Sequence, residues 1–407
     1  MILTGGKGMK RNNIALAILL MNLLIAFLGI GLVIPVTPAI MNELNISGTV
    51  VGYMIAAFAG AQLIVSPIAG RWADQFGRKR MIVIGLFIFS TSELLFGLGQ
   101  SVMPLFVSRI LGGVSAAFIM PAVTAFIADI TTIKSRPKAL GYMSAAISTG
   151  FIIGPAIGGF LAEVDTRLPF FFAAAFALGA AVLSLMTLKE PERNPENEEA
   201  EEAGTQKAGL KRVFAPIYFI PFVIILISAF GLASFESLFS LFADRKFGFS
   251  PKDIAIMITG GAILGAIVQI VFFSKLTIWL GEIRLIRYCL IFSAVLVYLM
   301  TTVNSYAAIL MVTMTVFVGF DLIRPAATTY LSKIAGNEQG FVGGMNSMFT
   351  SIGNVLGPVI GGMLFDVDFD YPFYFAAVMI VLSIGLSFLW AEPGKRKKKV
   401  AGKLSAG

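Results

Sequence analysis

Twelve apolar runs, each long enough to cross a lipid bilayer, follow one another along this chain of 407 residues. A spanning helix needs about 20 predominantly apolar residues, because its backbone polar groups find no water inside the bilayer. Only 13% of the residues are charged, whereas soluble domains carry about 25%. The sequence therefore predicts an all-α integral membrane protein with twelve transmembrane helices. The predicted spans are 12–42, 50–70, 81–99, 103–128, 139–162, 168–188, 214–243, 254–274, 288–303, 305–332, 339–365 and 371–391.

The basic residues indicate which side of the membrane each loop faces. If the N-terminus is cytoplasmic, 25 of the 31 Lys and Arg residues fall in inner segments and 4 in outer loops. Because Lys and Arg are enriched in cytoplasmic loops, both termini are predicted to be cytoplasmic. The remaining two, Arg109 and Arg324, lie inside predicted spans. The basic C-terminal tail is interpreted as attracted to anionic membrane lipid rather than to nucleic acid.

An internal repeat divides the chain into two related halves. Residues 150–174 align without gaps on residues 353–377, with 14 of 25 positions identical and an offset of 203 residues. Between the copies lies a polar, acidic segment with the composition of a flexible linker. Two pseudo-symmetric six-helix halves running the same way through the membrane are an architecture of transporters. The expected parts are the N-terminal half 1–188, the cytoplasmic linker 189–213, the C-terminal half 214–391 and the cytoplasmic tail 392–407.

Residues 70–80, GRWADQFGRKR, have fixed glycine, acidic and basic positions between the second and third spans. The Asp is suited either to cap the following helix or to pair with a cation, and the second Gly permits a tight turn. A purely topogenic basic loop is the alternative, although it would not need this Gly–Asp–Gly spacing. The candidate conformational residues of this loop are Gly70, Asp74, Gly77, Arg78 and Lys79.

The stretch GFIIGPAIGG, residues 150–159, places glycines four residues apart on one helix face. A neighbouring backbone can approach such a face closely, and Pro155 is expected to bend the helix. Generic small-residue packing also explains these glycines. Arg109 lies in RILGG with no acid one turn away in its own helix, so its partner must come from elsewhere; structural and proton-transfer roles both stay open. The candidate gating residues here are Arg109, Gly150, Gly154, Pro155, Gly158 and Gly159.

These motifs resemble those of the major facilitator superfamily, and within it the twelve-helix drug:proton antiporters. Residues 70–80 match the loop signature G-x-x-x-D-x-x-G-R-K/R, and residues 150–159 match the antiporter signature G-x-x-x-G-P-x-x-G-G. The stretches SAFGLASFESLFSLF (228–242) and FVGFDLIRPA (317–326) look like bacterial multidrug and quinolone exporters of the NorA and Bmr type. The resemblance implies a multi-pass protein of the bacterial plasma membrane that exports drugs. It also implies proton-coupling roles for Glu236 and Asp321.

Charged residues deep inside the spans are few, and a charge at the bilayer centre costs about 2.5–3.5 kcal/mol. Asp321 and Arg324 are three residues apart, on neighbouring faces of one helix; a self-neutralising buried pair is the plainer interpretation. The sharper hypothesis is a proton site, because burial favours the neutral carboxyl and a nearby guanidinium favours the ionised one. A movable Arg324 would then switch Asp321 between these forms. Glu236, which lacks a basic residue within one turn, is the predicted anchor for a cationic substrate.

The predicted function is proton-coupled multidrug efflux by antiport, with small-molecule drugs, protons and membrane lipid as partners of a functional monomer. An exporter of a sugar or another metabolite on the same fold is the alternative, although sugar sites usually need more polar and Trp residues in the spans. The chain has no His and one Cys, and it shows no nucleophile–base pair or phosphate loop. No enzyme activity, cofactor or metal is therefore predicted. The candidate substrate-cavity residues are Phe27, Gln62, Phe151, Phe235, Phe239, Gln269, Phe320, Asn346 and Asn354.

Overall fold

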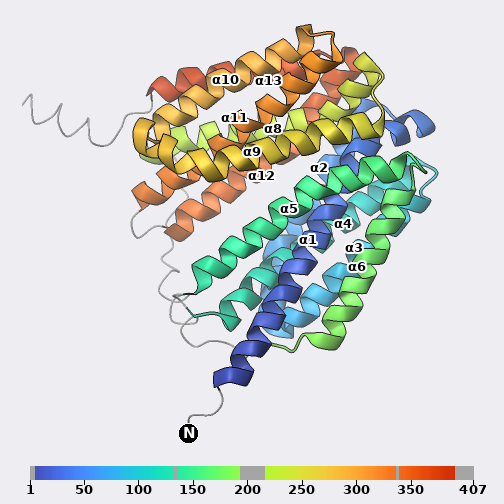
Figure 1. Cartoon of the computed structure of the whole chain (residues 1–407), viewed down its shortest axis with the longest axis vertical. Helices are drawn as coiled ribbons and strands as arrows, with labels where there is room; N and C mark the ends of the chain where they lie inside the picture. The colour runs from blue at the N-terminus through green and yellow to red at the C-terminus, as the bar shows by residue number, and fades with distance from the viewer. Residues whose placement is uncertain (1–4, 133–134, 193–215, 336–338, 390–407) are drawn as a thin grey trace, which may run out of the picture. The chain divides into compact units, whose positions relative to one another are not determined.

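The computed structural model describes residues 5–132, 135–192, 216–335 and 339–389. These ranges contain twelve α-helices that are long and apolar enough to cross a membrane, and no strand. The prediction of an all-α fold with twelve transmembrane helices is confirmed. The helices are α1 (Gly5–Leu44), α2 (Gly48–Phe76), α3 (Arg78–Leu98), α4 (Val102–Ile130), α5 (Arg136–Ala162), α6 (Leu168–Thr187), α8 (Pro216–Phe247), α9 (Pro251–Leu280), α10 (Glu282–Thr302), α11 (Tyr306–Ala335), α12 (Gln339–Val367) and α13 (Tyr371–Leu389) (Figure 1).

Several helices continue beyond the apolar runs from which they were predicted. Helix α2 ends at Phe76 although its apolar run ends at residue 70, and α8 reaches Phe247 rather than residue 243. Helical hydrogen bonding is internal to the segment, so it persists where charged side chains reach the membrane interface. Apolarity alone marks only the part of each helix that lies in hydrocarbon.

The turn between α8 and α9 shows how local sequence ends one helix and begins the next. Gly248 has a φ of +67°, the left-handed conformation in which glycine commonly terminates a helix. Ser250 and Asp253 then form a reciprocal cap: the Asp253 amide donates to Ser250 Oγ at 3.2 Å, and the Ser250 amide donates to Asp253 Oδ2 at 3.1 Å. Pro251 stands at the first position of α9, where its missing N–H is not needed.

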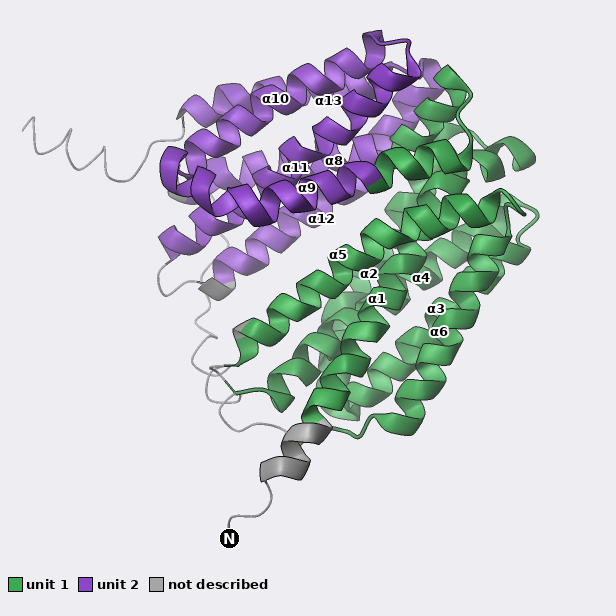
Figure 2. Ribbon diagram, in the orientation of Figure 1, with its two compact units in different colours: residues 1–206, 237–259 green, residues 207–236, 260–407 purple. Residues whose placement is uncertain are grey.

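The chain forms two compact units, shown in green and purple in Figure 2. Unit 1 comprises residues 1–206 and 237–259, and unit 2 comprises residues 207–236 and 260–407. Unit 1 thus holds α1 to α6 together with the turn between α8 and α9 and the adjoining helix ends. Of the expected linker, residues 193–213 lie outside the described ranges, as does the tail 392–407.

In unit 1, the glycine face of α5 lies directly against the backbone of α1. A Cβ atom at Gly150 would stand 2.7 Å from the carbonyl oxygen of Leu24, and one at Gly154 would stand 2.6 Å from that of Leu28. Gly158 is equally close to Leu32. These three glycines share one helix face, so replacing any of them would separate the two helices.

Unit 2 repeats this contact between α12 and α8. A Cβ atom at Gly353 would stand 2.9 Å from the carbonyl oxygen of Leu226, and one at Gly357 would stand 2.6 Å from that of Phe230. Gly353 and Gly357 follow Gly150 and Gly154 by 203 residues, the offset of the sequence repeat. The repeat therefore preserves a specific helix–helix contact as well as sequence.

Candidate functional site

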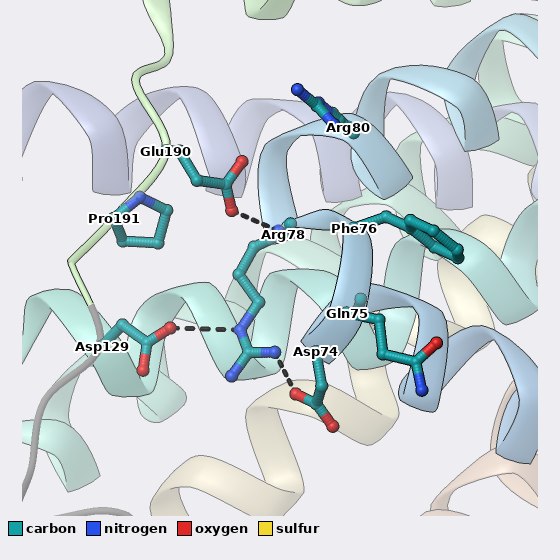
Figure 3. Close-up of a pocket in the computed structure, with 10 residues that line it drawn as sticks. Asp74, Gln75, Phe76, Arg78, Arg80, Asp129, Glu190 and Pro191 are labelled. Atoms are coloured by element: carbon teal, nitrogen blue, oxygen red, sulfur yellow. Dashed lines mark hydrogen bonds and ion pairs between the residues drawn. The ribbon is translucent and has the colours of Figure 1, made fainter.

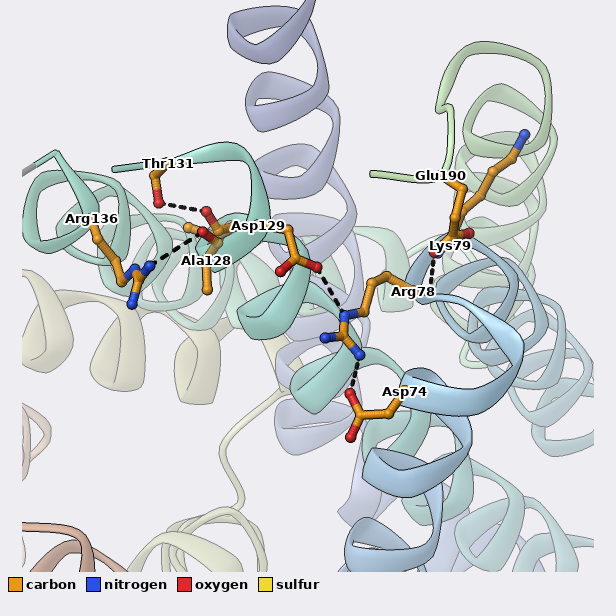
Figure 4. A network of polar contacts seen from close by, with 9 residues as sticks. Asp74, Arg78, Lys79, Ala128, Asp129, Thr131, Arg136 and Glu190 are labelled. Carbon is orange, nitrogen blue, oxygen red and sulfur yellow. Dashed lines mark hydrogen bonds and ion pairs between the residues drawn. The ribbon is translucent and has the colours of Figure 1, made fainter. Parts of the chain in front are cut away.

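The loop between α2 and α3 is organised around the guanidinium of Arg78. Its Nη1 atom pairs with Asp74, four residues earlier at the end of α2, and its Nε atom donates to Asp129 Oδ2 at 3.1 Å, from the end of α4 (Figure 4). The ion pair with Asp129 is largely buried, since the side chains of Arg78 and Asp129 are 12% and 5% exposed. Arg78 thus ties the loop to α4 through a carboxylate that sequence reasoning did not single out.

Glu190 caps the N-terminus of α3. Its carboxylate accepts from the backbone amide of Arg78 through one oxygen and from the amide of Lys79 at 3.1 Å through the other (Figures 3 and 4). A carboxylate at this end of a helix satisfies unpaired amides and complements the helix dipole. Sequence analysis considered Asp74 for this capping role; in the structure Asp74 pairs with Arg78 and Glu190 caps the helix.

Gly77 forms the turn between α2 and α3, and its lack of a side chain makes this arrangement sterically possible. Its φ of +106° is unfavourable for residues with a side chain, and a Cβ there would stand 2.7 Å from Glu190 Oε2. Lys79 adds a further tie, because its Nζ donates to the carbonyl of Leu185 at 2.8 Å. Gly70, by contrast, has room for a Cβ, with Pro121 at 4.0 Å as its nearest neighbour.

A cavity of about 300 Å³ opens beside this network (Figure 3). Asp74, Arg78, Asp129 and Glu190 line it, and Arg80 adds a second guanidinium. The full lining is Ala73, Asp74, Gln75, Phe76, Gly77, Arg78, Arg80, Asp129, Glu190 and Pro191. The carboxylates of Asp74 and Asp129 bind Arg78, and that of Glu190 binds the α3 amides. The site is therefore a structural junction of α2, α3, α4 and the segment that follows α6.

Arg109 has a carboxylate partner inside unit 1. Its Nη2 atom lies 3.3 Å from Glu93 Oε1, across from α4 to α3, and both residues are buried. The guanidinium also stacks 4.4 Å from the ring centroid of Phe96. Glu93 also lies within a predicted span, but no local spacing in the sequence connects residue 93 with residue 109.

Close packing at Gly159 joins α5 to the start of α9 within unit 1. A Cβ at Gly159 would stand 2.7 Å from the carbonyl oxygen of Pro251 and would overlap Ala255. Two polar contacts involve neighbouring segments: Lys252 Nζ lies 3.4 Å from Glu163 Oε2, and Asn42 Nδ2 donates to Asp244 Oδ2 at 3.1 Å. Pro155 packs against α1, because a Cβ at Gly31 would stand 2.9 Å from its Cδ.

The two acidic residues predicted to couple protons, Glu236 and Asp321, lie on α8 and α11 of unit 2. Glu236 is exposed on α8, and its neighbour Phe235 packs against Phe317 and Phe320 of α11, with ring centroids 5.7 and 6.0 Å apart. Asp321 follows Phe320 and is half-buried. The charges of Asp321 and Arg324 both act on Glu236, so the structure brings the three predicted proton-coupling residues into one electrostatic group.

Arg324 is exposed and points into a cavity of about 50 Å³ that Thr350 and Asn354 also line. Among the residues that the structure describes, no ion pair joins Arg324 to Asp321. The carboxylate instead lies against Gly265 of α9, whose Cβ, if present, would overlap Asp321 Oδ2.

The residues expected to line a substrate cavity fall into two groups by exposure. Phe235, Phe239 and Phe320 are buried, at 1%, 0% and 3% exposed, and pack inside the protein. The others are half-buried or exposed, namely Phe27, Gln62, Phe151, Gln269, Asn346 and Asn354. Phe27 and Phe151 contact each other edge to face at 5.0 Å, between α1 and α5.

Known proteins share both the sequence and the fold of this chain. The chain is 74% identical to Multidrug resistance protein 1 of Bacillus subtilis (strain 168) over 389 residues, which cover 96% of this chain and 99% of that protein. It is 45% identical to Quinolone resistance protein NorA of Staphylococcus aureus over 362 residues, covering 88% and 92% of the two chains.

Among solved structures, a bacterial homolog of the human lysosomal transporter Spinster has the same fold. That structure, titled as inward-facing and unoccupied, superposes with a TM-score of 0.79 at 18% identity, covering 93% of this chain and 97% of that one. The nucleoside transporter NupG superposes with a TM-score of 0.76 at 13% identity, covering 92% and 98%.

The family comparison covers nearly the whole chain. The model of the Major Facilitator Superfamily matches residues 19–320 and 221–405. With twelve membrane-length helices and relatives of high identity, this match defines the protein as a multi-pass membrane transporter by family. The chain belongs to the Major Facilitator Superfamily.

Proposed function

We propose that this protein is a proton-coupled multidrug efflux antiporter of the bacterial plasma membrane, active as a monomer with both termini in the cytoplasm. The observation that carries the proposal is an exposed carboxylate, Glu236, on a membrane-length helix of a chain 74% identical to a protein named for multidrug resistance. The excess of Lys and Arg in the segments assigned to the cytoplasm supports the orientation.

Competition for the carboxylates couples the drug to the proton. An exposed acid within a span attracts an organic cation, and the bound cation favours the ionised carboxylate. Protonation of Glu236 then removes the charge that holds the cation and releases it. Asp321 takes part in the same competition, since its charge interacts with that of Glu236. The charge of Arg324 also acts on Glu236.

The proton gradient supplies sufficient free energy for such exchange. One proton entering the cell down a membrane potential of 100 mV supplies about 2.3 kcal/mol. That energy supports a roughly 50-fold gradient of a substrate that carries no net charge, such as a zwitterion, since each factor of ten requires about 1.4 kcal/mol.

The proposed substrates are amphipathic aromatic compounds, many of them cationic or zwitterionic, such as dyes, quaternary ammonium compounds and quinolones. Half-buried and exposed aromatic residues, including Phe27 and Phe151, offer stacking and cation–π contacts to such molecules. Gln62, Gln269, Asn346 and Asn354 add polar contacts. Phe235, Phe239 and Phe320 are buried, so they are proposed to support the site by packing rather than by direct contact with the drug.

The conformational steps of alternating access are assigned to two regions of unit 1. The first region is the part of α5 that packs closely against its neighbours, and we assign to it a switch between discrete packing arrangements. Its residues are Gly150, Gly154, Pro155, Gly158 and Gly159. The junction of Asp74, Gly77, Arg78 and Lys79 holds the α2–α3 turn in one of these arrangements. Arg109 is assigned a positioning role within unit 1.

Ethidium accumulation in energised cells tests the proposal. Expression of the protein is expected to lower intracellular ethidium, and a protonophore is expected to abolish the difference. Glu236→Gln and Asp321→Asn are each expected to remove efflux while protein levels in the membrane stay normal. Full-rate efflux by both amide variants would exclude the assigned coupling. Efflux of a labelled sugar, but not of any dye or quinolone, would favour the metabolite exporter instead.

A further inference from the structure

Three side chains of α11 lie against three glycines of α9. Met314, Phe317 and Asp321 are three and four residues apart, so they share one face of α11. A Cβ at Gly260 would overlap the end of Met314, one at Gly261 would stand 2.5 Å from Phe317 Cδ2, and one at Gly265 would overlap Asp321 Oδ2. The three side chains thus pair with the three glycines in order along the two helices.

Only the third of these contacts involves a carboxylate. A Cβ at position 265 would also stand 3.0 Å from Asp321 Cγ and 3.5 Å from Asp321 Cβ, so the whole acidic group faces the bare backbone of α9. No hydrogen bond or ion pair of the Asp321 side chain is present among the described residues. Packing against Gly265, rather than a polar partner, therefore fixes where this carboxylate stands.

The charged surroundings of Asp321 are correspondingly sparse. Helix α9 has no charged residue between Asp253 and Lys275. Arg324 follows on the same helix, and Glu236 stands on α8, where it senses both charges. The position of the carboxylate relative to Arg324 and Glu236 is thus set chiefly by the space that α9 leaves.

We infer that Gly265 is a positioning residue for proton coupling: by lacking a side chain, it lets the Asp321 carboxylate rest against α9 and so fixes its distances from Arg324 and Glu236. The inference rests on the proposed role of Asp321 in coupling.

A methyl group at position 265 would have to displace the carboxylate. Asp has a short side chain, so its oxygens can leave this place only by rotation about χ1 or χ2 or by separation of α9 from α11. Either movement changes the distances from the carboxylate to Arg324 and Glu236. Misplacement of a reacting group by about 1 Å can reduce a rate by about 100-fold.

Gly265→Ala and Gly260→Ala form a matched pair for the test. Both add one methyl group to the face of α9 that contacts α11, but the second meets the flexible end of Met314, which can move aside. In proteoliposomes, Gly265→Ala is expected to lower proton-driven ethidium transport by about 10-fold or more and to shift its pH profile. Gly260→Ala is expected to retain the wild-type profile. An unchanged rate and profile in Gly265→Ala would overturn the inference.

A double-mutant cycle on thermal unfolding gives a second readout that needs no transport. Gly265→Ala is expected to lower the unfolding temperature in the wild-type background, and to have a much smaller effect in the Asp321→Ala background, where the carboxylate is gone. Equal losses in both backgrounds would contradict a direct contact between the two residues.

The outcomes also separate this inference from the proposed function. If Asp321→Asn transports normally, the coupling role of Asp321 fails, whatever the cycle shows. If Asp321→Asn is inactive while Gly265→Ala transports with an unchanged pH profile, the coupling role stands and the positioning role of Gly265 fails.

Discussion

The guanidinium of Arg109 lies 3.3 Å from the carboxylate of Glu93, and the two residues are 8% and 1% exposed. Among the residues that the structure describes, one oxygen of Glu93 and the Nε atom of Arg109 have no hydrogen-bond partner. The pair thus neutralises its charges without satisfying all of its polar atoms. Breaking such a pair is destabilising, because it leaves one buried charge unpaired.

Removing one member of this pair is expected to destabilise the protein strongly. Glu93→Leu leaves Arg109 buried and uncompensated, which costs about 3–5 kcal/mol in comparable cases. The double variant Glu93→Leu with Arg109→Leu is expected to recover most of that loss, because apolar groups then fill the space. Thermal unfolding of the purified proteins in detergent measures both effects. Similar unfolding temperatures for the single variant and the wild type would contradict this account of the pair.

The cap on α3 predicts a local effect of Glu190. Glu190→Gln keeps the size of the side chain but removes the charge that faces two backbone amides, for an expected loss of about 1 kcal/mol. Faster hydrogen exchange is expected in the first turn of α3, with little change elsewhere. Glu192→Gln is the control, since Glu192 is exposed and no bond to α3 is present in the described structure. Equal exchange rates in the two variants would argue against the cap.

The contact between α5 and α1 predicts opposite effects at two glycines. Gly154→Ala places a methyl group 2.6 Å from the carbonyl oxygen of Leu28, so it is expected to cost about 1–3 kcal/mol and to impair transport. Gly179→Ala on α6 meets no atom within 4 Å and is expected to be neutral or stabilising by about 0.5–1 kcal/mol, from helix propensity. Unfolding temperatures and ethidium efflux of both variants check this difference. A Gly154→Ala protein as stable as Gly179→Ala would show that α1 and α5 do not meet closely.

The helices and the duplication were predictable because the membrane imposes a simple rule on sequence. An unsatisfied backbone is costly in hydrocarbon, so each crossing leaves a long apolar run. The repeat of Gly150 and Gly154 at Gly353 and Gly357 was likewise visible, since the contact it preserves depends on spacing within one helix. Both signals are local.

The partners of the charged residues were not predictable, because they are far apart in sequence. Asp129 and Glu190 meet Arg78 across 51 and 112 residues, and neither belongs to the loop signature. The exposure of the aromatic residues could not be predicted from the sequence either. Phe235 and Phe151 both lie in apolar spans, yet the first is buried and the second is exposed. Only the packing of several helices decides these contacts.

The central claim is that the intramembrane carboxylates exchange a proton for a cationic drug. Isothermal titration of the purified protein with tetraphenylphosphonium near neutral pH, in two buffers with different heats of ionisation, measures protons released on binding. The wild type is expected to release protons as the cation binds, and Glu236→Gln is expected to release fewer or none. Binding of the cation to the wild type with the same apparent enthalpy in both buffers, and hence with no proton released, would contradict the account.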